Sequence, residues 1–529
     1  MKTPRPPRAV LSVVVLAVTA TVLSLASNGV SSVEDFLWKH VGFYPPWFDA
    51  DVTTNFVACG LALIPGGYAA QRYGPRAVLT ASVLGWSASV VVLTTAYDFP
   101  THRASRVLMG LSQGAALPAA VLLLTQSVPE CRRGLANGVV AFAGRFAQVA
   151  AAVVTPSVIA AFVPHSTTAT VTADDLSDDG QVMIHAVHAA QFRDIPESSP
   201  RAMVLLRIGD RLPESWPDYQ DMADAINAVI RDPGALDDAG RLSWNLNYDA
   251  RAILDLPVSE RSVAQSERLN RHVVDANVGY PVPRLHVPSW RPAFQTYGLL
   301  GVIVAVAVWL MLRDRHSSRV TQDIPAVPWL AILTSRNQWL SCGSTFFSTF
   351  GWVLPILVML WFLANRFRVP VKFDVMMAVP LFAGAFAMLA GGVVTDWLTR
   401  HSGQRWGRSL PMGGLKLSSA AFLAVSGFLP EGWVFVAAVT LAAMCHDFGT
   451  PAMWAFAQDT GGEQAGVVFA WSSLWGVIGA GVALAIVDGV IAKLGIDAVM
   501  LTAASAYVLS AACGLMANET VTLDGEPEA

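Results

Sequence analysis

The sequence carries little charge for its length. Only 14% of its 529 residues are charged, whereas an ordinary soluble domain carries about a quarter. The net charge of -4 and the pI near 6.2 also lack the strongly basic character that binding to nucleic acid requires. With 53% hydrophobic residues and a mean hydropathy of +0.47, the composition indicates a protein that lies in lipid. Nucleic acid is therefore not an expected partner.

Cysteines are few, and enzyme motifs are scarce. The five cysteines are scattered with no CxxC, and most lie in apolar runs, where a thiol behaves as a small hydrophobe. The chain has no Gly-rich phosphate loop and no HExxH. His185 and His188 lack a third ligand in sequence, and the aspartates from Asp174 to Asp179 lack the spacing of a calcium loop. We predict no enzyme activity, no cofactor and no metal site.

Long apolar runs are abundant. A helix needs about 20 mostly apolar residues to cross the hydrocarbon core, because its backbone polar groups must be satisfied within the segment. Such stretches in the first half are 9–29, 52–70, 77–96, 103–128, 134–163 and 295–312. Those in the second half are 338–363, 375–396, 411–429, 432–457, 464–490 and 496–517. We predict an all-α membrane protein with twelve transmembrane helices in two six-helix halves.

The first stretch has a second interpretation. It follows Lys2, Arg5 and Arg8, as the apolar part of a cleaved signal peptide does. We favour a transmembrane helix, because removing this stretch leaves an odd number and spoils the symmetry between the halves.

Arginines in the short loops predict the orientation, since positive residues collect on the cytoplasmic side. Those in alternate loops, on the side of the N-terminus, are Arg72, Arg76, Arg132, Arg133, Arg313, Arg315, Arg319, Arg400, Arg405 and Arg408. Arg366, Arg368 and Lys372 disagree, because they fall on the expected outer face. We expect a bacterial inner-membrane protein with both termini in the cytoplasm.

A polar segment interrupts the apolar pattern. Within 164–289, residues 202–208 resemble a strand, and 222–231 and 259–274 resemble helices. We expect a small α/β insert domain outside the cytoplasm. The chain then divides into helices one to five (1–163), the insert (164–289), helix six with the start of the central loop (290–320), and helices seven to twelve with the tail (321–529).

Two loops resemble each other. The loop after the second stretch contains Gly67, Gln71, Arg72, Gly74 and Arg76, and the loop after the eighth contains Gly392, Asp396 and Arg400. Both resemble the GxxxDRxGR loop of the major facilitator superfamily, in which the glycine lets helices approach and the charges hold the cytoplasmic gate. Gln71 stands where the family has an aspartate. The resemblance therefore implies a weaker gate contact in the first half.

Further motifs resemble one branch of that superfamily, the anion:cation symporters, which include hexuronate, galactonate, sialic acid and vesicular glutamate carriers. They lie at 106–118, 133–138, 289–294, 351–355 and 454–459. The resemblance implies a secondary transporter with inverted three-helix repeats and a cavity between the halves at the bilayer midplane. Leu25, Ala26 and Gln113 replace the Asp, Arg and Glu of proton-using members. The coupling ion, proton or sodium, is therefore not carried over.

Candidate site residues are polar groups within the apolar stretches, because burying an ionisable group in a membrane is costly. Arg145 lies near mid-depth, with Gln148 about one turn further on. Its alternative is a structural pairing with a carboxylate or a helix end. Arg106 matches the substrate-side arginine of the branch, and its alternative is an interfacial position. Gln113, Asn28, Trp352 and Ser473 complete the predicted cavity wall, although small polar residues such as serine also serve helix packing.

His446 and Asp447 are the predicted coupling residues, since a titratable pair within a helix can hold a proton. Adjacent helical residues point about 100° apart, so at most one of them faces the cavity. The alternative is that either residue packs against a neighbouring helix through a backbone hydrogen bond. A guanidinium pairs bidentately with a carboxylate, which makes an organic anion such as a sugar acid the expected substrate. We expect this substrate, rather than a fixed carboxylate such as Asp447, to neutralise Arg145.

Two other functions remain open. A non-transporting sensor or scaffold that presents the insert is favoured by the missing Asp, Arg and Glu, and is opposed by the gate loops and Arg145. An enzyme within the insert would need a catalytic cluster that is not visible. We predict a monomeric transporter whose partners are the bilayer and a small organic solute.

Overall fold

The computed structural model describes residues 6–30, 45–95, 99–161, 290–314, 327–363, 373–518 and 520. Every regular element in these ranges is a helix, which confirms the all-α prediction for this part of the chain. The insert predicted at 164–289, with its strand and the His185 and His188 pair, lies outside the described residues.

Two groups of helices follow each other along the chain. The first contains α1 (Pro6–Gly29), α3 (Pro45–Tyr73), α4 (Pro75–Thr94), α5 (Phe99–Ser127), α6 (Arg133–Ala161) and α14 (Trp290–Met311). The second contains α15 (Trp329–Thr334), α16 (Arg336–Trp361), α17 (Phe373–Ser409), α18 (Leu415–Ser426), α19 (Gly432–Phe448), α20 (Thr450–Gly461), α21 (Ala465–Leu494) and α22 (Asp497–Met516). A π-helical turn, Leu410–Gly414, joins α17 to α18.

Each predicted apolar stretch coincides with a helix, except that 432–457 corresponds to the pair α19 and α20. By length and hydropathy, eight segments of the described residues qualify as membrane-spanning. Two of these, Ala378–Ser426 and Gly432–Leu494, each contain more than one helix. The protein therefore has several membrane-spanning helices, while the number of twelve crossings stays a prediction.

Glycine and proline set the helix ends where the chain turns. Gly74 has a φ of 92°, which favours glycine, and separates α3 from α4. Pro75 then begins α4, because a proline at the first helical position gives up no hydrogen bond. Gly449 lies between α19 and α20, and Pro451 lies in the first turn of α20.

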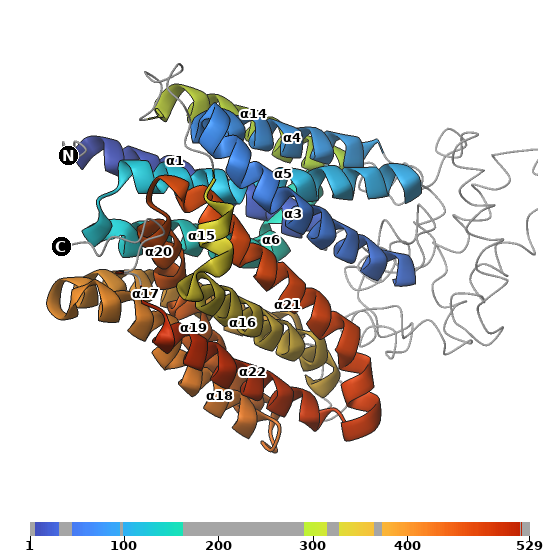
Figure 1. The fold of residues 1–529 in the computed structure, drawn as a ribbon. Coiled ribbons are helices and arrows are strands. Elements are labelled where there is room, and N and C mark those ends of the chain that lie inside the picture. The colour runs from blue at the N-terminus through green and yellow to red at the C-terminus, as the bar shows by residue number, and fades with distance from the viewer. Residues whose placement is uncertain are drawn as a thin grey trace, which may run out of the picture.

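The two groups form two bundles, each with its own apolar core (Figure 1). In the first bundle α3 packs on α5, α1 on α6, and α4 on both α5 and α14. In the second, α16 packs on α21 and α22, while α19 packs on α17 and α18. Buried core residues include Trp86 and Phe294 in the first bundle and Phe435 and Tyr507 in the second.

The two most extensive contacts between the bundles are those of α6 with α17 and of α3 with α21. Both contacts depend on glycine. A Cβ atom added at Gly67 would lie 2.9 Å from the carbonyl oxygen of Gly466, and one at Gly392 would lie 2.6 Å from that of Gly134. Larger residues do not fit there, so these glycines allow the backbones of the two bundles to touch.

Large apolar side chains cover the outer surface. Leu310 is 70% exposed and Leu330 is 77% exposed, as expected of side chains that face lipid tails. The start of α1 and the end of α22 lie at the same end of the molecule (Figure 1). We call this the termini end.

Candidate functional site

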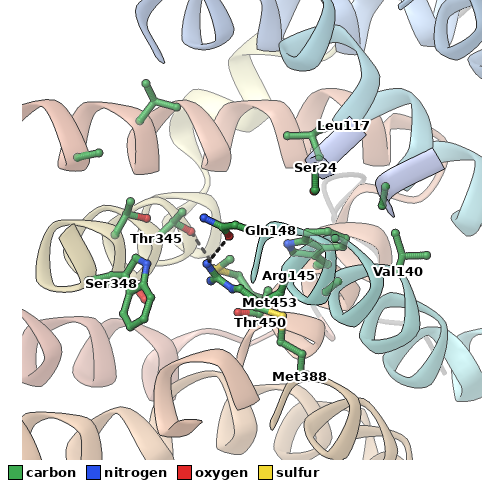
Figure 2. Close-up of a pocket in the computed structure, with 18 of the residues that line it drawn as sticks. Ser24, Leu117, Val140, Arg145, Gln148, Thr345, Ser348, Met388, Thr450 and Met453 are labelled. Atoms are coloured by element: carbon green, nitrogen blue, oxygen red, sulfur yellow. Dashed lines mark hydrogen bonds between the residues drawn. The ribbon is translucent and has the colours of Figure 1, made fainter. Parts of the chain in front are cut away.

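A cavity of about 750 Å³ lies between the two bundles. Its wall combines residues of α1, α3, α4, α5 and α6 from the first bundle with residues of α16, α17, α18, α19, α20 and α21 from the second. The lining is mostly apolar, with a few polar side chains (Figure 2). Both the volume and this mixture are typical of small-molecule sites, in which a few polar groups orient the ligand.

Arg145 of α6 lies in the cavity wall and joins the two bundles. Its Nη2 donates to Oδ1 of Asp447 in α19 over 2.9 Å, and its Nη1 donates to Oε1 of Gln148 over 3.2 Å (Figure 2 shows the contact with Gln148). The Asp447 side chain is fully buried, and that of Arg145 is 17% exposed. Arg145 therefore has a fixed carboxylate partner in this structure, and our expectation that the substrate neutralises it needs correction.

His446 and Asp447 point in different directions, as expected of adjacent residues in a helix. His446 lines the cavity, whereas Asp447 lies behind the wall. The His446 ring stacks on Trp352 with centroids 5.1 Å apart and an interplanar angle of 1°, and its Nδ1 lies 3.1 Å from Oγ of Ser348. The Arg145 guanidinium lies 5.4 Å from the centroid of the same Trp352 ring. Trp352 thus positions both basic groups through π contacts.

Lys416 of α18 also lines the cavity, and the sequence interpretation missed it. The residue is 2% exposed, and its Nζ donates to Oγ of Ser344 and Oγ of Ser510. A lone lysine within the apolar stretch 411–429 is a signal that could have found it, because a lysine at membrane depth needs a polar cavity or a partner.

Four predicted cavity residues do not line the cavity: Arg106, Gln113, Asn28 and Ser473. Each lies along its helix beyond the part that reaches the cavity. The lining residues of α5 begin at Ala116, which is ten positions, about 15 Å of helix, from Arg106. Asn28 lies one turn after Ser24, the last lining residue of α1, and its amide donates to the carbonyl of Ser24. Packing between helices decides which part of each helix lines the cavity. The sequence pattern of a single helix does not contain this information.

The gate loop of the second half holds the start of α6. Both carboxylate oxygens of Asp396 in α17 accept backbone hydrogen bonds, from Gly134 over 2.8 Å and from Leu135 over 2.9 Å. A carboxylate is favoured there by the free N–H groups and the positive dipole of a helix N-terminus. Arg400, in the same loop, donates to the carbonyl oxygen of Cys131 over 3.3 Å. The gate residues of the second half thus contact the first bundle directly.

A network of ionic contacts surrounds Asp396. Asp459 of α20 binds Arg133 of α6 at 2.5 Å and Arg408 of α17 at 2.8 Å. Arg408 also lies 3.6 Å from Asp396 and donates to the carbonyl oxygen of Glu130. We call Glu130, Arg133, Asp396, Arg408 and Asp459 the gate network. It links the bundles next to the end of α17, where Ser409 donates to Ala517 beyond the end of α22.

The gate loop of the first half is built differently. The backbone N–H of Arg76 donates to Oδ1 of Asp314 over 3.0 Å, so a residue that follows α14 holds the start of α4. Arg72 donates to the hydroxyl of Tyr68, one turn earlier in α3. The Oε1 atom of Gln71 is buried and has no hydrogen-bond partner among the described residues. Gln71 therefore does not repeat the contacts of Asp396.

Two helical bundles with apolar outer surfaces and a central cavity define a multi-pass membrane protein of the transporter type. The family model of the Major Facilitator Superfamily matches residues 13–171 and 284–484. The chain belongs to this superfamily, as the gate loops predicted.

Relatives agree with this assignment. The chain is 24% identical over 196 residues to the probable L-galactonate transporter of Escherichia coli K12, a match that covers 32% of this chain and 41% of that protein. Among solved structures, it is similar to the E. coli fucose:proton symporter FucP, with a TM-score of 0.59, 13% identity and coverage of 96% and 98%. It is also similar to the human organic anion transporter MFSD10, with a TM-score of 0.52, 13% identity and coverage of 96% and 100%. At these identities the two structures support the fold alone.

Proposed function

We propose that this protein is a secondary active transporter that carries a small organic anion, such as a sugar acid or another carboxylate. The observation that carries this proposal is the cavity between the bundles, which is lined by Arg145, Lys416 and His446. A guanidinium or ammonium group favours a carboxylate, while the apolar remainder of the wall receives the carbon skeleton. The probable galactonate carrier among the relatives supports a sugar acid as the first test compound.

Transport is proposed to proceed by alternating access, in which the bundles rock about the cavity. In the described arrangement, the gate network and the pair Asn137 and Gln458 link the bundles near the termini end. Asn137 Nδ2 donates to Gln458 Oε1 over 2.9 Å, from α6 to α20. With the termini assigned to the cytoplasm by the positive-inside rule, this arrangement is the one closed toward the cytoplasm. These links must break each time the cavity opens to that side.

Uptake into proteoliposomes tests the transport function. Purified full-length protein should accumulate labelled galactonate when a proton or sodium gradient is imposed, whereas protein-free liposomes should not. Binding of galactonate without uptake would contradict the proposal and would favour the sensor or scaffold.

A reversible cross-link tests the alternating-access step. In a chain whose native cysteines are replaced, the variant with both Asn137→Cys and Gln458→Cys should lose uptake upon oxidation and recover it upon reduction. Each single variant under the same oxidant is the matched control. Full uptake by the oxidised double variant would show that the bundles need not separate at this position.

A further inference from the structure

The environment of Lys416 identifies it as a hydrogen-bond donor with a fixed position. Its Nζ lies 3.2 Å from Oγ of Ser344 in α16 and 3.0 Å from Oγ of Ser510 in α22. Both serines are fully buried. Three helices thus converge on one amino group at the wall of the cavity.

The serines can only accept hydrogen bonds from this amino group. Ser510 Oγ donates its proton to the carbonyl oxygen of Ser344 over 2.7 Å, and Ser344 Oγ donates to that of Ser510 over 3.2 Å. A hydroxyl has one proton, so each serine offers only lone pairs to Lys416. An ammonium has three N–H donors, and the two serines use two of them. The third donor remains available to a ligand.

The charge of Lys416 has no counter-ion within the described ranges, where its hydrogen-bond partners are two neutral hydroxyls. The other fixed cation of the cavity differs in this respect, because Arg145 is paired with Asp447. When Lys416 is in its ammonium form, Arg145 and Lys416 count as +1 each and Asp447 as -1, so these three groups carry a net charge of +1. A buried charge needs compensation, and one negative charge in the cavity supplies it.

We infer that Lys416 receives the single negative charge of the substrate and so makes the cavity selective for monoanions. Arg145, held by Asp447 and lying against Trp352, then serves as a neutral pair that hydrogen-bonds and positions the rest of the molecule. This inference rests on the proposed function. It adds to that function a specific residue and a specific substrate charge.

Three compounds with the same six-carbon skeleton test the inference: galactose, galactonate and galactarate, which carry no, one and two carboxylates. Their binding is measured by titration calorimetry on the purified full-length protein. Wild-type protein should bind galactonate most tightly. Lys416→Gln should weaken galactonate binding about tenfold or more, as expected from loss of a charge-assisted contact, and should leave galactose binding unchanged. Lys493→Gln, which removes an exposed lysine at the end of α21, is the matched control.

A reciprocal variant tests the charge count. Asp447→Asn leaves Arg145 without its carboxylate and raises the net charge of the group to +2, so affinity for galactarate should rise relative to galactonate. The thermal melting curve of each variant reports whether it is folded, and the order of affinities of the wild-type protein for the three compounds tests the charge count whichever variant fails to fold.

The outcomes separate the two proposals. Unchanged galactonate affinity in Lys416→Gln, with wild-type binding intact, overturns the inference and leaves the transporter assignment standing. Tighter binding of galactose than of galactonate by the wild type overturns the organic-anion function and the role of Lys416 with it. Failure of all three compounds to bind wild-type protein likewise overturns both the sugar-acid assignment and the inference.

Discussion

Arg145 and Asp447 lie 302 positions apart in the chain, and their side chains form an ion pair of 2.9 Å that joins the two bundles beside the cavity. A guanidinium stays protonated under any realistic condition, so its burial at membrane depth demands a partner. The carboxylate of Asp447 meets that demand in the described structure. Opening of the bundles must either break this pair or move both residues together.

Loss of one member of this pair should destabilise the protein strongly. Arg145→Gln should lower the free energy of unfolding by about 3 to 5 kcal/mol, because it leaves a buried carboxylate without its cation. Unfolding in mixed detergent micelles measures the change. The double variant with Asp447→Asn should be less destabilised than the sum of the two single variants, since residues in contact are energetically coupled. Additive effects would show that the pair contributes no coupling energy.

The gate loop of the first half has Gln71 where the second has Asp396, and a carboxylate at this position should stabilise the protein. Gln464, at the start of α21, makes no side-chain capping hydrogen bond, and Gly67 packs against Gly466 one turn before Gln71 along α3. Gln71→Asp should therefore raise stability by about 1 kcal/mol through the N-terminal dipole of α21. Thermal melting measures the shift. Asp396→Asn is the opposite control and should lower stability, because it weakens the existing contact at α6. Destabilisation by Gln71→Asp would show that the added carboxylate does not reach the helix N-terminus.

Topology can be tested with one introduced cysteine and one native cysteine. Lys493 is exposed at the end of α21, and Cys131 is exposed just before α6, beside the gate network. In intact cells, an impermeant maleimide should label the Lys493→Cys variant but should not label Cys131, if the termini end faces the cytoplasm. Permeabilised cells provide the control, because Cys131 should then react. Labelling of Cys131 from outside would reverse the proposed orientation.

His446 is the cavity residue expected to carry a coupling proton. Its ring stacks on Trp352 and contacts Ser348, and these contacts hold its position in the cavity wall. Imidazole is the side chain that most readily exchanges a proton near neutral pH. His446→Gln should abolish accumulation driven by an imposed proton gradient, whereas exchange of internal for external substrate, which needs no net proton movement, should survive. His401→Gln changes an exposed histidine in α17 and is the control. Full proton-driven accumulation by His446→Gln would exclude this role.

Much of the architecture could be predicted from local features of the chain. Apolar stretches of sufficient length identify membrane helices because lipid leaves the backbone no other partner, and each stretch coincides with described helices. Motif residues such as Gly392 and Asp396 can be recognised from a contiguous pattern, and the structure places both against the start of α6. The distance of a single polar residue from the start of its apolar stretch also indicates its depth in the membrane. Arg145, predicted at mid-depth, does lie in the cavity wall.

The sequence by itself therefore determined the class of protein, the helices and the family, since each follows from composition, hydropathy or a contiguous motif. Only the tertiary structure decided which polar groups meet. It placed Lys416 in the cavity wall, paired Arg145 with Asp447, and left Arg106 outside the lining residues. The physical reason is that the rotation and axial offset of one helix against another depend on packing between segments hundreds of residues apart. No periodicity within a single helix records these two quantities.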